Sequence, residues 1–240
     1  MTTVSSAILD PLMASDPAGP RITYYDDATG ERIELSTATL ANWAAKTANL
    51  LRDELSAGPS SRVAVLLPAH WQTAAVLFGI WWIGAEVVLG PDPDGQADIA
   101  LCTVDRLVDA DDAVGMGEIA VLSLDPFGKP VADLPVGLTD YATAVRVHGD
   151  QISPEQHPGP ALDGRSVAEV LAAARDSAAA RGLTAQDRVL SSKPWTTGTD
   201  LIDNLLAALV AGASLVQVSN PEPAAVDKHR TAEKVSRTLE

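Results

Sequence analysis

A helix–strand–helix–strand order occurs twice in this chain, in halves that span about 20–91 and 164–219. The spacing within the two copies nearly matches, because six residues separate Arg62 from Pro68 and the same number separates Arg188 from Pro194. Each copy has a continuous apolar strand, which is typical of a parallel strand covered on both faces. The recurrence predicts an α/β fold, a layered sheet-and-helix fold with two similar halves.

The domain organisation follows from the same pattern. We expect one compact domain over 1–240, with a strand-rich segment at 92–163 between the halves and a C-terminal helix or tail at 221–240. Apolar spacing, turn residues and capping residues indicate the elements. The predicted helices cover 3–15, 37–55, 71–83, 104–109, 166–182, 199–211 and 224–239, and the predicted strands cover 21–25, 32–35, 62–67, 86–89, 99–103, 119–122, 144–147, 187–190 and 214–218.

Composition excludes several classes of protein. Hydrophobic residues make up 46% of the chain and the net charge is -15, which describes an acidic globular protein that repels nucleic acid and anionic membrane surfaces. The N-terminus lacks a signal peptide, and polar residues interrupt the most apolar stretch, 63–90, so we expect a cytoplasmic protein without membrane insertion. A single cysteine, Cys102, excludes an internal disulfide. Abundant alanine, and arginine in excess of lysine, are typical of a GC-rich genome.

Several segments resemble the opening of the adenylate-forming superfamily, which comprises acyl-CoA synthetases, peptide-synthetase adenylation domains and luciferases. The segments that carry the resemblance are 22–24, 40–55, 61–68, 79–88, 185–190 and 205–213. They encode strands and helix packing rather than chemistry. The resemblance covers most of 20–220 and implies a fold like the first subdomains of the large N-terminal domain of these enzymes.

The chain does not match the motifs on which the chemistry of that superfamily depends. Its members bind ATP phosphates on a loop rich in Thr, Ser and Gly, followed by Pro-Lys-Gly, and the resemblance places this loop just before Ser166. The chain has no lysine at 148–163 and carries the carboxylates Asp150 and Glu155, which disfavour a triphosphate. The later family motifs, including the ribose-binding Asp and the catalytic Lys, are absent as well, so we assign no catalytic residue.

The loop Ser191–Thr199 is a weak candidate for an anion or ligand site, with Trp195, Thr196, Thr197 and Gly198 as its residues. It follows a strand and precedes a helix, so its backbone N–H groups could face an anion. The competing interpretation is an ordinary strand-helix turn in which Thr197 or Thr199 caps the helix. No Pro-Lys-Gly follows, and Asp200 places negative charge there.

The remaining patterns favour structural roles. The segment Asp92–Asp98 superficially resembles a calcium loop but has Thr103 where a glutamate is required, and no two of the four histidines have metal-ligand spacing, so no metal site is predicted. His70 follows a strand end, where capping or packing beside Trp71 is favoured over a role in a site. Trp81 and Trp82 are adjacent on a helix, so we expect one of them to be exposed.

Three functions remain open. The first is a catalytically incompetent relative of adenylate-forming enzymes with a binding, regulatory or partner-interaction role, as a homodimer or with a protein partner, and without a cofactor. The second is an ATP- and Mg-dependent enzyme that activates carboxylates, or half of one completed by a partner chain. The third is a sensor of an acyl or nucleotide ligand. The missing phosphate loop favours the first function and a protein that is not an enzyme.

Overall fold

The computed structural model describes residues 2–90 and 96–239. Contacts divide these residues into two compact units, which are described separately. Unit 1 comprises the described residues of 1–7, 41–67 and 72–167, and unit 2 comprises those of 8–40, 68–71 and 168–240. Helices α1 (Val4–Ser15) and α2 (Thr37–Asp53) run from one unit into the other. No helix within the described residues has both the length and the apolar character needed to cross a membrane.

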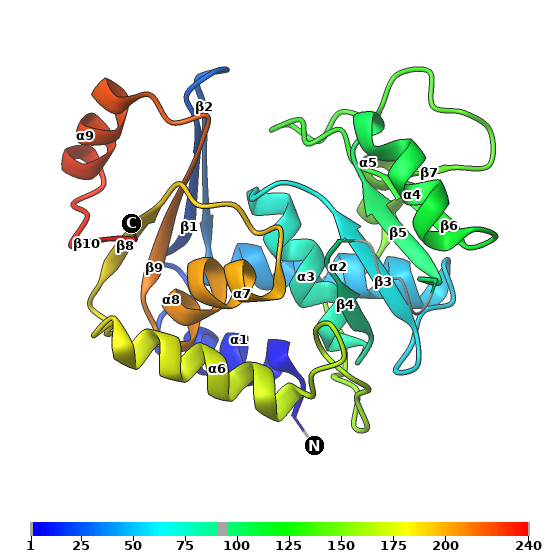
Figure 1. The fold of residues 1–240 in the computed structure, drawn as a ribbon, viewed down its shortest axis with the longest axis horizontal. Coiled ribbons are helices and arrows are strands. Elements are labelled where there is room, and N and C mark those ends of the chain that lie inside the picture. The colour runs from blue at the N-terminus through cyan, green and yellow to red at the C-terminus, as the bar shows by residue number, and fades with distance from the viewer. Residues whose placement is uncertain (1, 91–95, 240) are drawn as a thin grey trace. The chain divides into compact units, whose positions relative to one another are not determined.

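Unit 1 contains a parallel sheet with strand order β4–β3–β5–β6–β7 (Figure 1). The strands are β3 (Arg62–Leu66), β4 (Glu86–Val88), β5 (Ile99–Cys102), β6 (Glu118–Val121) and β7 (Thr139–Asp140). Helix α3 (Trp71–Trp82) connects β3 to β4, and α4 (Leu107–Val114), which follows a 3-10 turn η1 (Val104–Arg106), connects β5 to β6. All four β3 residues after Arg62 are buried, which confirms the expected two-sided cover.

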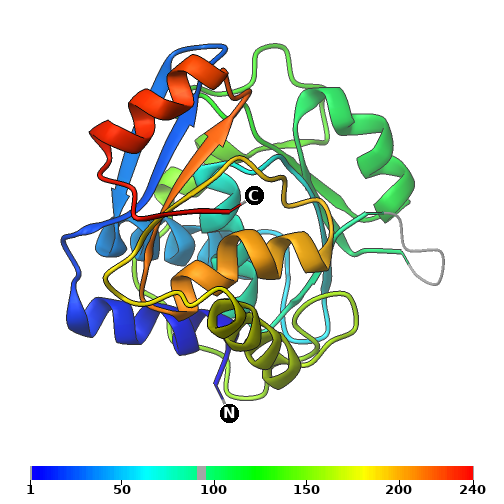
Figure 2. The same ribbon diagram turned by 60° about the vertical axis from the view of Figure 1, so that its left-hand side comes forward.

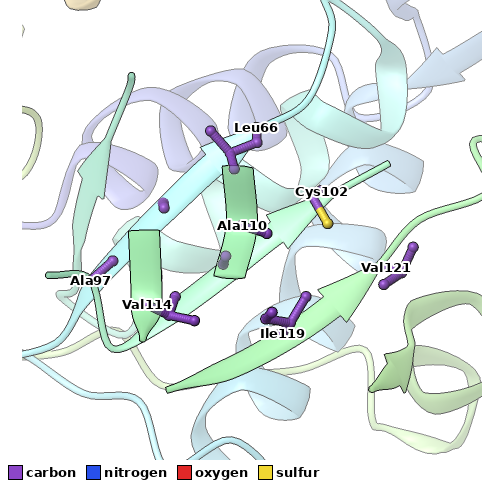
Figure 3. Close-up of a cluster of buried hydrophobic side chains, with 9 residues drawn as sticks. Leu66, Ala97, Cys102, Ala110, Val114, Ile119 and Val121 are labelled. Carbon is purple, nitrogen blue, oxygen red and sulfur yellow. The ribbon is translucent and has the colours of Figure 1, made fainter. Parts of the chain in front are cut away.

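The core of unit 1 on one sheet face lies beneath α4. Ala110 and Val114 of the helix pack there against Leu66, Cys102 and Val121 of three strands, and Figure 3 shows this cluster. Cys102 is fully buried, and burial raises the pKa of its thiol to about 11, so it acts as a small apolar side chain.

Unit 2 contains a mixed sheet with strand order β10–β8–β9–β1–β2. The strands are β1 (Pro20–Asp26), β2 (Glu31–Ser36), β8 (Arg188–Ser191), β9 (Ser214–Ser219) and β10 (Arg237–Leu239). Only the β1–β2 hairpin is antiparallel among these pairs. Helix α6 (Val167–Ala180) precedes β8, and α9 (Pro223–Ala232) precedes β10.

The two faces of this sheet carry different helices. Val226 of α9 packs on Val216 and Val218, and α9 lies beside the hairpin in Figures 1 and 2. The segment between β8 and β9 lies on the other side of the sheet in Figure 1. It consists of α7 (Gly198–Leu201), a π-helical turn η3 (Ile202–Leu206) and α8 (Ala207–Val210), so the helix predicted at 199–211 has a widened turn in its middle.

Three sequence predictions are wrong. The segment 144–147 is not a strand but belongs to α5 (Tyr141–Ala144) and the 3-10 turn η2 (Val145–Val147), because Asp140 caps the turn by accepting from the Thr143 N–H. The helix expected at 224–239 ends at Ala232, and the chain then adds β10 beside β8. Trp81 and Trp82 are both buried, and the Trp81 indole donates to the Ala161 carbonyl at 2.7 Å.

Candidate ligand-binding site

The predicted anion loop follows β8 and forms a helix cap. Thr197 is the N-cap of α7: its Oγ1 accepts from the Asp200 N–H at 3.1 Å, and its own N–H donates to the Asp200 carboxylate at 3.1 Å. The Thr196 hydroxyl donates to the same carboxylate at 3.0 Å. The capping interpretation is therefore confirmed for Thr197, and two donors of the loop already serve an internal anion.

Beside this cap lies a group of buried polar side chains. Gln217 of β9 donates to the Lys193 carbonyl at 3.1 Å, and Asn204 of the π-helical turn donates to the Pro194 carbonyl at 3.3 Å. These two bonds hold the backbone that leads to Trp195. Trp195 and Gln217 are only 2% and 1% exposed. The Trp195 Nε1 and the Gln217 Oε1 are nevertheless without a hydrogen-bond partner among the described residues, which is uncommon for buried polar atoms.

A second polar group sits on the adjacent strand of unit 2. Tyr24 of β1 is the cross-strand partner of Gln217, and the rings of Tyr24 and His70 meet edge to face at 4.3 Å. Burial raises the pKa of Tyr24 to about 12, despite a hydrogen bond with Ser219 that acts in the other direction. Burial also lowers the pKa of His70, although Glu31 opposes the effect. These groups are therefore neutral at pH 7, and His70 packs against Tyr24 and Trp71 as expected.

The segment before Ser166 forms a strap along β4 in unit 1. We use strap for residues 155–164. The Glu155 N–H donates to the Trp82 carbonyl at 3.0 Å, and the Gly159 N–H donates to the Gly84 carbonyl at 3.0 Å. The Asp163 N–H and the Ala161 carbonyl both bond to the backbone of Val87, each at 3.0 Å. Gly159 lies so close to residue 59 that an added Cβ would come within 2.0 Å of the Pro59 carbonyl oxygen.

No group of three or more His, Cys, Asp or Glu side chains in 2–90 and 96–239 could hold a metal ion. Most of the calcium-like segment at 92–98 lies outside the described residues. His148 contacts Glu54 at 2.8 Å, and His229 contacts Asp27 at 2.7 Å, so both of these histidines have carboxylate partners.

Sequence analysis missed a network of charges around Glu233. This buried carboxylate accepts from the Tyr25 hydroxyl at 2.6 Å, from Arg32 at 2.8 Å and from Arg188. Burial disfavours the charge, but these hydrogen bonds outweigh it and lower the pKa of Glu233 to about 2. No local signal could have revealed the network, since its members lie on β1, β2 and β8 and just beyond α9.

Solved structures define the class of fold. An acyl-CoA synthetase from Brucella canis matches 99% of this chain with a TM-score of 0.81 at 16% identity, and MbtA from Mycobacterium smegmatis matches 99% with a TM-score of 0.76 at 21% identity. A benzoate CoA ligase from Burkholderia xenovorans matches 99% with a TM-score of 0.75 at 14% identity. The chain spans 47%, 47% and 50% of these structures, respectively. Its fold is that of the N-terminal subdomain of acyl-CoA synthetase-like proteins.

A curated relative identifies the family. A Mycobacterium tuberculosis protein named "TIGR03089 family protein" is 67% identical over 242 residues, which cover 99% of this chain and 98% of that protein. The chain therefore belongs to the TIGR03089 family. No protein-family model matches the chain.

Proposed function

We propose that this protein is a catalytically incompetent relative of adenylate-forming enzymes that acts by binding a protein partner or a second copy of itself. The observation that carries the proposal is the strap. It occupies the sequence position at which the resemblance places the phosphate loop, and the N–H groups of Glu155, Gly159 and Asp163 are bonded to carbonyls. A phosphate loop needs such N–H groups for phosphate oxygens.

Charge supports the same proposal. The family lysine that would neutralise a triphosphate has no counterpart at 148–163, where Asp150 and Glu155 add negative charge to a chain of net charge -15. Without a bound cation, carboxylates beside a triphosphate weaken its binding. We therefore propose that the protein acts without ATP and magnesium as cofactors.

Exposed apolar side chains support the binding role. Six of the seven large hydrophobic side chains that are strongly exposed among the described residues come from 104–147 of unit 1, and Phe127 and Val136 are 81% and 106% exposed. Exposed apolar surface in a soluble protein often marks a site of association. A homodimer or a heteromeric complex would cover part of it.

The test of catalytic competence is carboxylate-dependent exchange of labelled pyrophosphate into ATP. With the full chain, magnesium and a panel of aliphatic and aromatic carboxylates, we expect no exchange above a mock preparation. Exchange that copurifies with the protein and falls in Thr196→Val would overturn the proposal. Thr199→Val is the matched control, because Thr199 is exposed and its side chain forms no hydrogen bond among the described residues.

A second function is favoured by the buried atoms that lack partners. A ligand sensor of unit 2 would use the Trp195 N–H as a donor and the Gln217 carbonyl as an acceptor. Each buried polar atom left unpaired costs about 1–3 kcal/mol, so the binding of a ligand that paired with both atoms would recover this free energy. Native mass spectrometry of freshly purified protein tests this function: a copurifying small molecule that is lost in Gln217→Leu supports it, and apo protein from several growth conditions contradicts it.

A further inference from the structure

A cavity of about 690 Å³ opens in unit 2 at the amino ends of the parallel strands β1, β8 and β9. The loop with Trp195 follows the carboxyl end of β8, so the cavity and this loop lie at opposite ends of the strands. Its volume lies within the range of small-molecule sites. Charged side chains of its lining are Asp16, Arg21, Glu34, Arg188, Glu233 and Lys234, together with Asp187.

Arg21 is the most unusual member of the lining. The residue is only 4% exposed, yet it forms no ion pair among the described residues. Its Nε donates to Thr37 at 3.1 Å, and its Nη1 donates to the carbonyls of Gly212 and Ala213 at 2.7 and 2.9 Å, just beyond the end of α8. The Nη2 forms no hydrogen bond within this unit. Burial lowers the pKa of Arg21, and the negative charge of Asp16 acts in the opposite direction, so this carboxylate offsets only part of the cost of burying the guanidinium.

The other charges of the lining are largely compensated. Glu34 and Glu233 pair with Arg32 and Arg188, and Asp187 pairs with Arg237 at 3.5 Å. Two cations then remain without an ion pair in the described structure, Arg21 and Lys234, against one carboxylate, Asp16. Once Arg32 and Arg237, which do not line the cavity, are counted with their carboxylate partners, one positive charge is left over.

We propose that this cavity binds a small organic monocarboxylate, whose carboxylate is held by the Arg21 Nη2 and the Lys234 ammonium. A single negative charge balances the uncompensated positive charge. A second negative charge on the ligand, as in inorganic phosphate or ATP, would have no partner left in the cavity. The site does not depend on catalytic competence, because its lining includes no residue of the strap or of the loop that contains Trp195.

Calorimetry with the full-length protein tests the site. Sodium butyrate is titrated against a sodium chloride blank of equal ionic strength, and sodium phosphate is titrated in parallel. We expect saturable heat with one butyrate per chain and affinity for phosphate at least about tenfold weaker. Absence of butyrate binding by folded protein, or phosphate binding of equal affinity, would overturn the proposal.

Two variants locate the binding. Lys234→Glu should weaken butyrate about tenfold or more, because a charge-assisted hydrogen bond contributes about 1.5–3 kcal/mol. Lys228→Glu makes the same charge change at an exposed position of α9 outside the lining, and should leave the affinity unchanged. Arg21→Met should abolish binding if it folds, and Lys234→Glu remains informative if it does not. Equal affinities in the Lys234 and Lys228 variants would contradict the assignment.

Discussion

Glu233 is a buried carboxylate that joins parts of unit 2 which are distant in sequence. Its oxygens accept from Tyr25, Arg32 and Arg188, which come from three different strands. The residue itself immediately follows α9, a helix with no buried residue of its own. Its hydrogen bonds therefore hold the end of α9 at the sheet, where apolar burial contributes little.

Replacement of this carboxylate should destabilise the protein. We expect Glu233→Gln to lower the free energy of unfolding by about 3 kcal/mol, because the half-buried Arg188 loses its closer carboxylate partner and keeps, among the described residues, only Glu34, at 3.6 Å. Urea denaturation followed by circular dichroism measures the change. Asp227→Asn is the matched control, since Asp227 pairs with Arg230 on the exposed side of α9, and exposed pairs contribute about 0–1 kcal/mol. A change as small as the control's would show that Glu233 does not hold α9.

The same carboxylate sets an acid limit. The pKa of Glu233 is about 2 in the folded protein, below its usual 4.5, so its stabilising contribution is fully present above about pH 4.5. That contribution is lost as the pH falls from 4.5 toward about 2. Thermal unfolding between pH 7 and pH 3 should therefore show a steeper loss of stability in the wild type than in Glu233→Gln. Parallel curves would exclude this linkage.

Thr197 acts as the N-cap of α7. Thr197→Ala removes the Oγ1 that accepts from the Asp200 N–H, and we expect it to cost about 1 kcal/mol of stability. Thr199→Ala, two residues further on, should be nearly neutral. Thermal melting of both variants measures the difference, and equal melting temperatures would argue against the cap.

At the scale of elements, the strap depends on the lack of a side chain at Gly159. An added Cβ would come within 2.0 Å of the Pro59 carbonyl oxygen, so Gly159→Ala should displace the strap and cost about 2 kcal/mol. Limited proteolysis should then cut within 155–164. Gly149→Ala is the control, because the nearest atom to its Cβ would be 3.9 Å away. Resistance of Gly159→Ala to protease would show that the strap tolerates the shift.

Elements with continuous or periodic apolar patterns could be predicted from the sequence, and β3 and α2 formed close to their expected bounds. The errors arose where distant contacts decide the outcome. At 144–147 the alternation of Val145 and Val147 favoured a strand, but the Asp140 cap and the bond of the Tyr141 hydroxyl to Thr47 at 2.6 Å select a helical turn. The C-terminal strand forms because β8 offers a free edge, which no local pattern reveals.

The candidate sites divide in the same way. The cap at Thr197 could be predicted, since it depends on residues within one turn. The pairing of Tyr24 with Gln217, and the cavity around Arg21, could not, because they bring the N-terminal strand together with residues from the last third of the chain. The division into similar halves at 20–91 and 164–219 stays a prediction.

At the scale of the whole molecule, charge and apolar exposure act against each other. A net charge of -15 makes two copies repel, whereas exposed side chains such as Phe127 and Val136 favour association. If the protein forms a homodimer, we expect its association to strengthen between 50 mM and 500 mM salt, because salt screens the repulsion.

Sedimentation at micromolar concentration measures this association. Phe127→Ser and Val136→Ser should weaken the dimer, and Met13→Ser is the control, since Met13 is only 37% exposed and lies outside 104–147. A monomer at every salt concentration would exclude the homodimer and leave a different protein as the partner.

The order of strands in unit 2 has a consequence for synthesis on the ribosome. The β1–β2 hairpin emerges well before β9, so Ile22 finds its parallel partner only when Leu215 has been made. Until then the apolar faces of the hairpin have no sheet to complete, and unit 1 can collapse in the interval because its last described residue is 167. The nascent chain must therefore keep β1 and β2 from pairing with a wrong strand until β9 has been made.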